Sequence, residues 1–237
     1  MKKVVQNFLP SQNGFHFPNS FADVPYEFKL LGIDVKGGHA MNGMCGGMIY
    51  ATCDLFYASR LAPVQQDAPD QGPLFKALCQ RLIESFALPF GQLRYYFWMN
   101  PRVADSDEDL PRFSLVTHGR AWKTIAVEWP HIRREIDANH LCPIGIILLK
   151  SWNPNDLGRN HQVLVYGYKL EGDDLKLLLY DPNSPGDDGV YLEFNIAEPR
   201  KRVAITYANS LGKVGNVVCL FKTRYKLKVP SGHPAGV

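Results

Sequence analysis

The chain has 237 residues, of which 46% are hydrophobic and 21% are charged, a composition typical of a globular protein with one large domain or two small ones. The formal net charge of +3 is too small to indicate a nucleic-acid-binding protein, and no apolar run is long enough to span a membrane. We expect no signal peptide, because only two apolar residues follow the initial Met-Lys-Lys. The five irregularly spaced cysteines favour neither a disulfide scaffold nor a metal knuckle. We therefore expect a reducing compartment, most simply the cytoplasm, with leaderless secretion as the alternative.

The first part of the chain is predicted to be mainly helical. Residues 1–40 are rich in Gly, Pro and Asn, and we expect irregular coil there. Residues 100–119 are acidic and are expected to form a mobile loop. The helix predicted over residues 121–139 contains Pro130, which kinks or restarts it. Apolar residues recur at helical spacing in segments 45–60 and 121–139, and a further helix is predicted over 73–86, with Pro73 in its first turn.

The second part of the chain changes to the pattern of β-strands. "CPIGIILLK", which begins at Cys142, is a continuous apolar run typical of a central strand. "HQVLVYGYKL" and "LKLLLYD" flank the turn sequence "EGD", as in a β-hairpin. In residues 221–228 basic and other side chains alternate, which predicts a strand with one solvated face rather than a polyanion site. Three further strands are predicted, over residues 189–196, 201–208 and 214–229.

Helices followed by antiparallel strands indicate an α+β fold rather than an alternating α/β fold. We expect residues 1–237 to form a single domain. Within it, an irregular N-terminal segment covers about 1–40, a mainly helical half covers 41–140, and an antiparallel sheet half covers 141–229.

Cys45 is predicted to lie in the first turn of a helix, followed by Gly46 and Gly47. Only the thiolate form of cysteine attacks a carbonyl carbon, and both the N–H groups of a helix N-terminus and a nearby imidazolium lower a thiol pKa. The two glycines weaken the helix, but they leave room for a substrate backbone beside the sulfur and expose N–H groups for a developing oxyanion. Taken alone, the Cys-Gly-Gly motif also fits a tight structural turn.

His161 opens one strand of the predicted hairpin, and Asp181 closes the other. If "EGD" forms the loop, Leu170 faces Asp174. Val163 then faces Asp181, so that His161 and Asp181 are diagonal neighbours on one face, roughly 7–8 Å apart at Cα. A loop one residue longer or shorter would put them on opposite faces unless a bulge corrects the register. In this geometry His161 is the general base for a thiol, and Asp181 orients its ring.

Four segments in this order resemble the papain-like cysteine peptidase clan, and most closely its bacterial branch, the peptidases that process double-glycine leader peptides and their many relatives. The segments are "MCGGMIYATCDLF", "WPHIRREIDANHLCPIGIILL", "NHQVLVYGY" and "LLLYDPN". The resemblance covers about residues 39–183 and implies a papain-like fold, with a helical half packed on an antiparallel sheet half. It implies Cys45 as the nucleophile, His161 as the base and Asp181 as the orienting acid.

Such peptidases usually carry a glutamine a few residues before the cysteine, which completes the oxyanion hole. This chain has none between Gln12 and Cys45. Trp152, which lies in the loop before the predicted histidine strand, is a candidate wall of the cleft, with simple packing as the alternative. The candidates for the missing oxyanion donor are Asn42, which we favour, His39 and Asn19.

The residues and the resemblance together predict a thiol-dependent hydrolase, a cysteine peptidase or amidase that forms a thioester acyl-enzyme on a peptide or another amide. An acyltransferase or transglutaminase-like enzyme would use the same residues with an amine acceptor. A catalytically inactive papain-fold binding module is the third hypothesis, and the missing glutamine favours it.

Neither a cofactor nor a metal is expected. "DPNSPGDDG" begins like a calcium loop, but Pro185 occupies a ligand position and Leu192 stands where the final glutamate belongs. No histidine pair has the spacing of a helical zinc site, and no phosphate-cradling or dinucleotide glycine motif occurs. We expect no nucleic-acid partner and no membrane span, and the sequence does not predict the oligomeric state.

Overall fold

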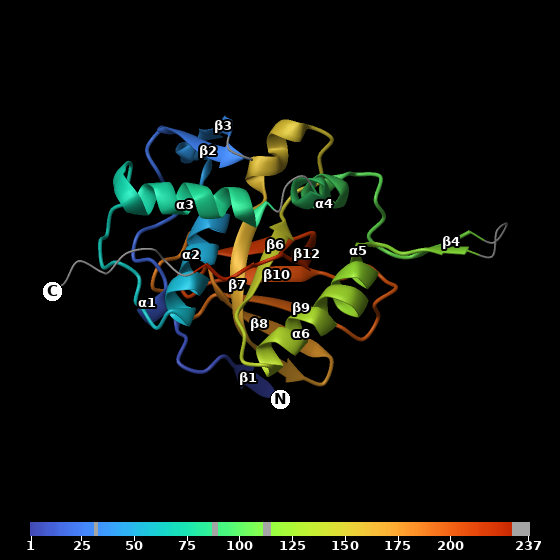
Figure 1. Ribbon diagram of the computed structural model, residues 1–237. Helices are drawn as coiled ribbons and strands as arrows, with labels where there is room; N and C mark the ends of the chain where they lie inside the picture. The colour runs from blue at the N-terminus through green and yellow to red at the C-terminus, as the bar shows by residue number, and fades with distance from the viewer. Residues whose placement is uncertain (31–32, 87–89, 111–114, 229–237) are drawn as a thin grey trace.

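The computed structural model describes residues 1–30, 33–86, 90–110 and 115–228 and has a mixed α+β architecture, with helices packed around a curled antiparallel sheet (Figure 1). Its helices are α1 (Pro10–Asn13), α2 (Cys45–Tyr57), α3 (Gly72–Ser85), α4 (Phe90–Met99), α5 (Arg120–Trp122) and α6 (Trp129–Asp137). The strands of the large sheet are β1 (Lys2–Val4), β6 (Cys142–Ile147), β7 (His161–Glu171), β8 (Asp174–Tyr180), β9 (Tyr191–Asn195), β10 (Ile205–Ala208), β11 (Val214–Val217) and β12 (Cys219–Lys222).

The large sheet curls until its two ends meet. Its strand order is β11-β10-β9-β8-β7-β6-β12, so β11 and β12 lie at opposite ends. A single residue, Val218, separates these two strands in the chain. One residue spans only about 3.3–3.6 Å, so the sheet has to roll up to bring its ends together, as in a barrel. The predicted strand over 214–229 is therefore two short strands with a break at Val218.

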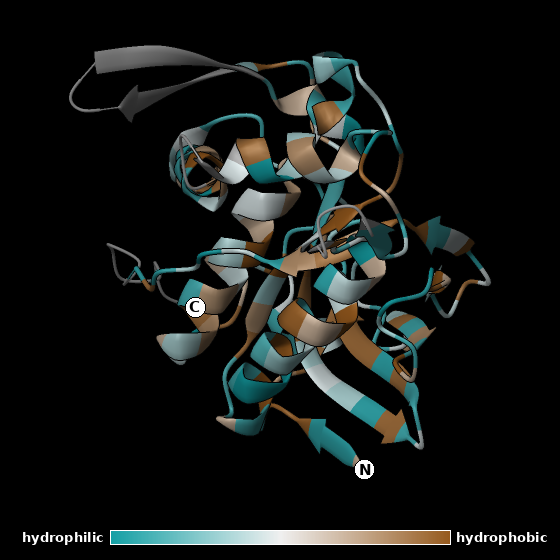
Figure 2. Ribbon diagram, turned by 90° about the vertical axis from the view of Figure 1, so that its right-hand side faces the viewer, coloured by the Kyte–Doolittle hydropathy of each residue, from teal (hydrophilic) through white to brown (hydrophobic). Residues whose placement is uncertain are grey.

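The strands at the centre of the sheet are buried on both faces. Every residue of β6 is buried, and so are the first eight residues of β7. Burial on both faces is the reason for the continuous apolar run in this part of the sequence. β1, by contrast, is short and partly exposed, and it extends the sheet beside β7 where β6 has ended. Figure 2 shows this terminal strand in the hydrophilic colour.

Irregular coil over residues 1–40 is a wrong prediction. Besides β1 and α1, the segment forms a second, two-stranded sheet of β2 (Pro25–Leu30) and β3 (Ile33–His39). β1 pairs with the second half of β7, so the N-terminus belongs to the sheet half of the domain. Backbone pairing of this kind needs no apolar periodicity in the paired strand, and the sequence pattern therefore misses it.

The helical segments differ from the prediction in three places. α4 has no predicted counterpart, because half of its ten residues are aromatic and aromatic residues favour strands. The predicted loop over 100–119 contains a strand pair, β4 (Glu108–Leu110) with β5 (Leu115–Thr117), which extends away from the body in Figure 1; residues 111–114 lie outside the described residues. The predicted helix over 121–139 is α5, a π-helical segment η3 (Lys123–Glu128) and α6, in which Pro130 occupies the first turn.

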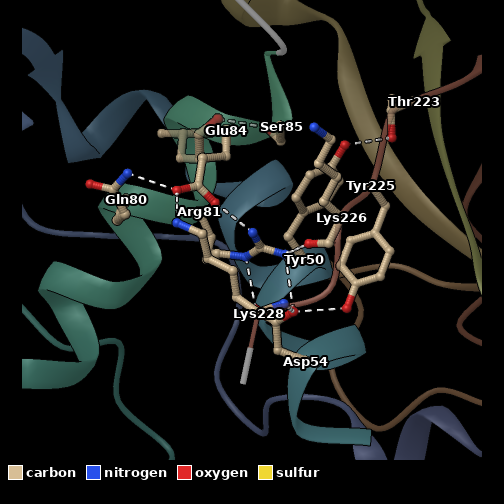
Figure 3. A network of polar contacts seen from close by, with 11 residues as sticks. Tyr50, Asp54, Gln80, Arg81, Glu84, Ser85, Thr223, Tyr225, Lys226 and Lys228 are labelled. Atoms are coloured by element: carbon tan, nitrogen blue, oxygen red, sulfur yellow. Dashed lines mark hydrogen bonds and ion pairs between the residues drawn. The ribbon is translucent and has the colours of Figure 1, made fainter. Parts of the chain in front are cut away.

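The C-terminal segment after β12 is tied to α2 and α3 by a buried polar network (Figure 3). Arg81 of α3 donates to the carbonyl of Lys226 and forms an ion pair with Asp54 of α2 at 2.8 Å. The Asp54 carboxylate also accepts hydrogen bonds from the Tyr225 hydroxyl and the Lys228 amide. Strand structure ends at Lys222, whereas the predicted strand continues to residue 229. Residues 229–237 lie outside the described residues. In the described part of the chain, no helix is long and apolar enough to cross a membrane.

Candidate active site

Cys45 is the first residue of α2, as the sequence predicts. The chain reaches it through a turn of 3₁₀ helix, η1 (Ala40–Asn42), and then through Gly43, whose φ of 88° suits glycine. The amide of Met44 donates a 2.6 Å hydrogen bond to Oδ1 of Asn19, which holds this entry turn in place. Cys45 is partly exposed, whereas the other four cysteines are buried. Cys45 is therefore the most exposed of the five cysteines.

Gly46 and Gly47 serve helix packing and do not line the cavity beside Cys45. A Cβ atom on Gly46 would lie 2.1 Å from Oγ of Ser85 on α3 and 2.8 Å from the side-chain nitrogen of Gln162 on β7. A Cβ atom on Gly47 would lie 2.3 Å from a backbone carbonyl of α3. The glycines let α2 approach α3 and β7 closely enough to bring the thiol to the sheet, and their role beside a substrate stays a prediction.

His161 is the first residue of β7, and its ring lies between the other two predicted residues. Nε2 is 2.7 Å from Oδ1 of Asp181, and His161 lines the same cavity as Cys45. Because Nε2 is engaged by the carboxylate, Nδ1 is the ring nitrogen left to exchange a proton with the thiol. Burial alone would lower the pKa of His161, but the charges of Asp181 and Cys45 and their hydrogen bonds outweigh it and raise the pKa to about 10.

The pKa of the Cys45 thiol is shifted in the opposite direction. Burial alone would raise its pKa, but the charge of His161 and a hydrogen bond from its ring lower it, together with the backbone N–H groups of Gln162 and Gly46. The net effect is a pKa below that of an ordinary thiol. A lowered thiol pKa beside a raised imidazole pKa favours transfer of the thiol proton to the ring.

Asp181 is buried and fully hydrogen-bonded. Besides His161, its Oδ1 accepts a 2.7 Å hydrogen bond from the Asn183 amide, and its Oδ2 accepts one of 2.7 Å from the Tyr207 hydroxyl. Burial alone would raise the pKa of Asp181, but the charge and hydrogen bond of His161, with these two donors, lower it. The carboxylate therefore stays ionised and can orient the ring.

His161 and Asp181 meet because of a β-bulge. The loop of the hairpin has two residues, Gly172 and Asp173, and Leu170 therefore pairs with Leu175, so the predicted pairing of Leu170 with Asp174 is wrong. The register then shifts between Val165 and Gly167, which leaves Tyr166 as an extra residue. Beyond the bulge the pairing agrees with the predicted register, and the two side chains share a face.

The three oxyanion candidates occupy different places. Asn42 is exposed and lines the cavity that contains Cys45. His39 is turned toward Asp23, with Nδ1 2.5 Å from its carboxylate. Asn19 binds Met44, and its amide nitrogen lies 3.3 Å from Oδ1 of Asn183. Asn42 thus stays the candidate donor, whereas Asn19 is a structural residue.

Trp152 does not line this cavity. It is half exposed, the Arg102 guanidinium lies over its ring, and its carbonyl accepts a hydrogen bond from Tyr96. The same loop does reach the cavity through Leu157 and Gly158 of a short 3₁₀ helix, η4 (Pro154–Arg159). Residues of the predicted loop thus line the cavity, but Trp152 is not among them.

Sequence reasoning misses four residues around the site: Tyr95, Gln162, Asn183 and Tyr207. Gln162 directly follows His161, and Asn183 follows Asp181 by two residues, so nearness to the predicted site could have indicated both. Nδ2 of Asn183 lies 3.2 Å from Nε2 of His161. Tyr95 and Tyr207 come from α4 and β10, and local sequence carries no signal for either.

Family models, curated proteins and solved structures were compared with the chain. None of them matches. What the site can do therefore has to be argued from its own chemistry. A partly exposed cysteine with a lowered thiol pKa beside an imidazole, with a buried carboxylate bonded to the ring, can attack an acyl carbon and return a proton to the leaving group.

Proposed function

We propose that this protein is a papain-like thiol hydrolase that cleaves an amide or related acyl bond through an acyl-enzyme on Cys45. The observation that carries the proposal is the 2.7 Å hydrogen bond between His161 and Asp181, with Cys45 and His161 lining one cavity. The thiol lies at a helix N-terminus, and the base and the acid lie on an antiparallel sheet that curls toward closure. The sequence resemblance implies the same arrangement, with the nucleophile on the helical half and the base and acid on the sheet half.

In the first half of the reaction, the Cys45 thiolate forms a bond to the carbonyl carbon, and the π electrons of the C=O bond move to oxygen. Asn42, which lines the cavity, is the candidate donor to that oxygen. When the oxyanion collapses, the C–N bond breaks, and Nδ1 of His161 gives its proton to the leaving amine. The product is a thioester on Cys45 and a neutral imidazole, held in its tautomer by Asp181.

In the second half, the neutral ring takes a proton from water as the water oxygen attacks the thioester. Collapse releases the carboxylic acid and leaves the sulfur as thiolate beside the protonated ring. Each step moves one proton through one nitrogen, so the carboxylate itself need not change its protonation state.

The test is whether an activated ester acylates Cys45. We expect p-nitrophenyl acetate to give a burst of p-nitrophenol, followed by slower turnover, and acid quenching with peptide mapping to place the acetyl group on Cys45. Cys45→Ala should abolish the burst. Cys53→Ala is the matched control, because Cys53 lies on the same helix but is buried.

Absence of an acetyl group on Cys45 would refute the proposal and favour a binding module. Addition of an amine acceptor separates the remaining alternatives: a hydrolase releases mainly acetate, whereas an acyltransferase releases mainly the N-acetylated amine.

A further inference from the structure

Two buried polar atoms beside the candidate nucleophile have no hydrogen-bond partner in the described part of the chain. They are the hydroxyl of Tyr95 and Oε1 of Gln162. Tyr95 is 6% exposed and Gln162 is 2% exposed. An unpaired polar atom inside a protein is costly, and a native structure seldom keeps one without a reason.

The two atoms lie on the same face of the sheet. Gly145 of β6 pairs with Gln162 of β7, and a Cβ atom on Gly145 would lie only 2.3 Å from the Tyr95 hydroxyl. Because glycine has no Cβ atom, Gly145 leaves space for the Tyr95 hydroxyl beside Gln162. Cross-strand neighbours of this kind project their side chains to one side.

The orientation of the Gln162 amide follows from its partner. Ser85 uses its hydroxyl hydrogen for the carbonyl of Leu82, at 2.7 Å, so its Oγ is left to accept. Gln162 meets that Oγ at 3.1 Å and must present its NH₂ group to it. Oε1 is therefore the end of the amide without a partner, and it is an acceptor.

Both residues line the cavity that contains Cys45 and His161. Its walls are otherwise largely apolar, from Leu82, Phe86 and Leu157. The side chain of Asn160, which also lines it, is already bonded to the amide of Leu148 and the carbonyl of Leu157. The cavity holds about 110 Å³, less than the roughly 150 Å³ of an engineered cavity that admits benzene.

These features specify the group that would fit. It is short, it has apolar methylenes for the walls, and it carries a donor for Oε1 of Gln162 and an acceptor for the Tyr95 hydroxyl. Among the described residues that line the cavity, none is Asp, Glu, Lys or Arg, and the charge of His161 is directed at Asp181 and Cys45, so the cavity offers a charged group no free counter-charge. A primary carboxamide meets every requirement.

We propose that the pocket formed by Tyr95 and Gln162 selects substrates with a glutamine or asparagine side chain next to the bond that is cleaved. This inference rests on the proposed function, because the pocket is defined relative to Cys45. It adds a substrate class to that function.

The test uses acetylated dipeptide chloromethyl ketones, which alkylate a thiol at a rate that reports recognition. Gln, Met or Glu is placed in turn at each of the two positions, with Gly at the other. We expect the Gln probe to alkylate Cys45 about tenfold faster than the Met probe at one of the positions, because Met has a similar length but cannot pair the buried atoms. Tyr95→Phe should reduce this Gln-to-Met ratio to near one.

Tyr96→Phe is the matched control, because Tyr96 is the next residue of α4 and bonds to the carbonyl of Trp152 instead. It should keep the preference for Gln. A Met preference, or equal rates at both positions, would overturn the proposal. So would a Glu preference, which would mean that the side chain reaches past Tyr95 into a second cavity of about 80 Å³ lined by Arg94 and Arg224.

The experiments distinguish a wrong pocket inference from a wrong assignment of Cys45 as the nucleophile. If Cys45 reacts with iodoacetamide but the probes do not discriminate, the pocket inference is wrong and the proposed function stands. If Cys45 does not react at all, the same peptides as simple amides can be titrated into the Cys45→Ala protein by NMR. Shifts confined to Tyr95 and Gln162 with the Gln peptide would support the pocket without the thiol, and their absence would refute it.

Discussion

The Tyr207 hydroxyl donates a 2.7 Å hydrogen bond to Oδ2 of Asp181, the carboxylate oxygen that His161 does not use. A residue of β10 thus completes the environment of a residue that follows β8. The pKa of Asp181 is below its ordinary value, since the charge of His161 and the surrounding donors outweigh the effect of burial. A carboxyl group with a lowered folded-state pKa stabilises the fold above its unfolded pKa, and this stabilisation is lost as pH falls through the folded pKa.

Tyr207→Phe removes one donor from this buried carboxylate. We expect the free energy of unfolding at neutral pH to fall by about 1–3 kcal/mol, and acid unfolding to begin at a higher pH. Turnover should fall as well, because Asp181 then holds His161 less firmly. Urea unfolding and an acid titration measure the two effects. Tyr191→Phe, on the adjacent strand and in contact with Lys176, is the control, and an equal loss there would rule out a specific role for Tyr207.

The alkylation rate of Cys45 should depend on pH in an unusual way. Because the pKa of its thiol is lowered, iodoacetamide should still react at pH values where an ordinary thiol is protonated, and the rate should fall only below the lowered pKa. In His161→Ala, burial becomes the main influence on the pKa, so the profile should move to higher pH. Peptide mapping with time identifies the alkylated residue. A wild-type profile like that of free cysteine would contradict the ion pair.

Asn42 and Asn19 should differ in what they affect. Asn42→Ala removes an exposed side chain that lines the cavity, so turnover should fall, by about 10²–10³-fold if Asn42 is the oxyanion donor, with little change in stability. Asn19→Ala leaves the Met44 amide without its acceptor and should lower the free energy of unfolding by about 1 kcal/mol. Steady-state kinetics and urea unfolding of both variants test the assignment. Unchanged turnover in Asn42→Ala would exclude it as the donor.

Gly46→Ala should destabilise the protein by several kcal/mol. The new methyl group would lie 2.1 Å from Oγ of Ser85 and 2.8 Å from the Gln162 amide, so these two buried side chains would have to shift and give up their mutual hydrogen bond. Thermal unfolding and the burst amplitude should both reveal this displacement. Gly215→Ala, where a Cβ atom meets nothing within 4 Å, is the matched control and should change little. A stable and fully active Gly46→Ala protein would show that the close packing is unnecessary.

Arg81→Met should separate the C-terminal segment from α2 and α3 (Figure 3). It leaves Asp54, which is 5% exposed, without its cation, and breaking a buried pair in this way costs about 3–5 kcal/mol. Arg133→Met, which breaks a largely exposed pair with Asp137, should cost less than about 1 kcal/mol. Urea unfolding compares them. Equal losses would mean that burial does not set the strength of the Arg81 pair.

Much of the candidate site follows from local pattern. The helix that begins at Cys45, the strands that begin at His161 and end before Asp181, and the order of helices before antiparallel strands can all be deduced from the spacing of apolar residues and from turn residues. This works because helix and strand periodicity reflect which side of a short segment is buried, and a short segment carries that information in its own residues.

The meeting of these residues depends on contacts between distant segments. The two-residue turn alone would place His161 and Asp181 on opposite faces, and the bulge at Tyr166 reverses this. Tyr166 is held there by long-range contacts: its ring packs against Phe8, its hydroxyl bonds to the carbonyl of Asp188, and its own carbonyl accepts from Val5. Likewise, Tyr207 reaches Asp181 only because the sheet order brings β10 to that side. The residues thus specify the chemistry, whereas the packing of segments far apart in the chain specifies the geometry, because strand register is chosen by the contacts that bury both sides of a sheet.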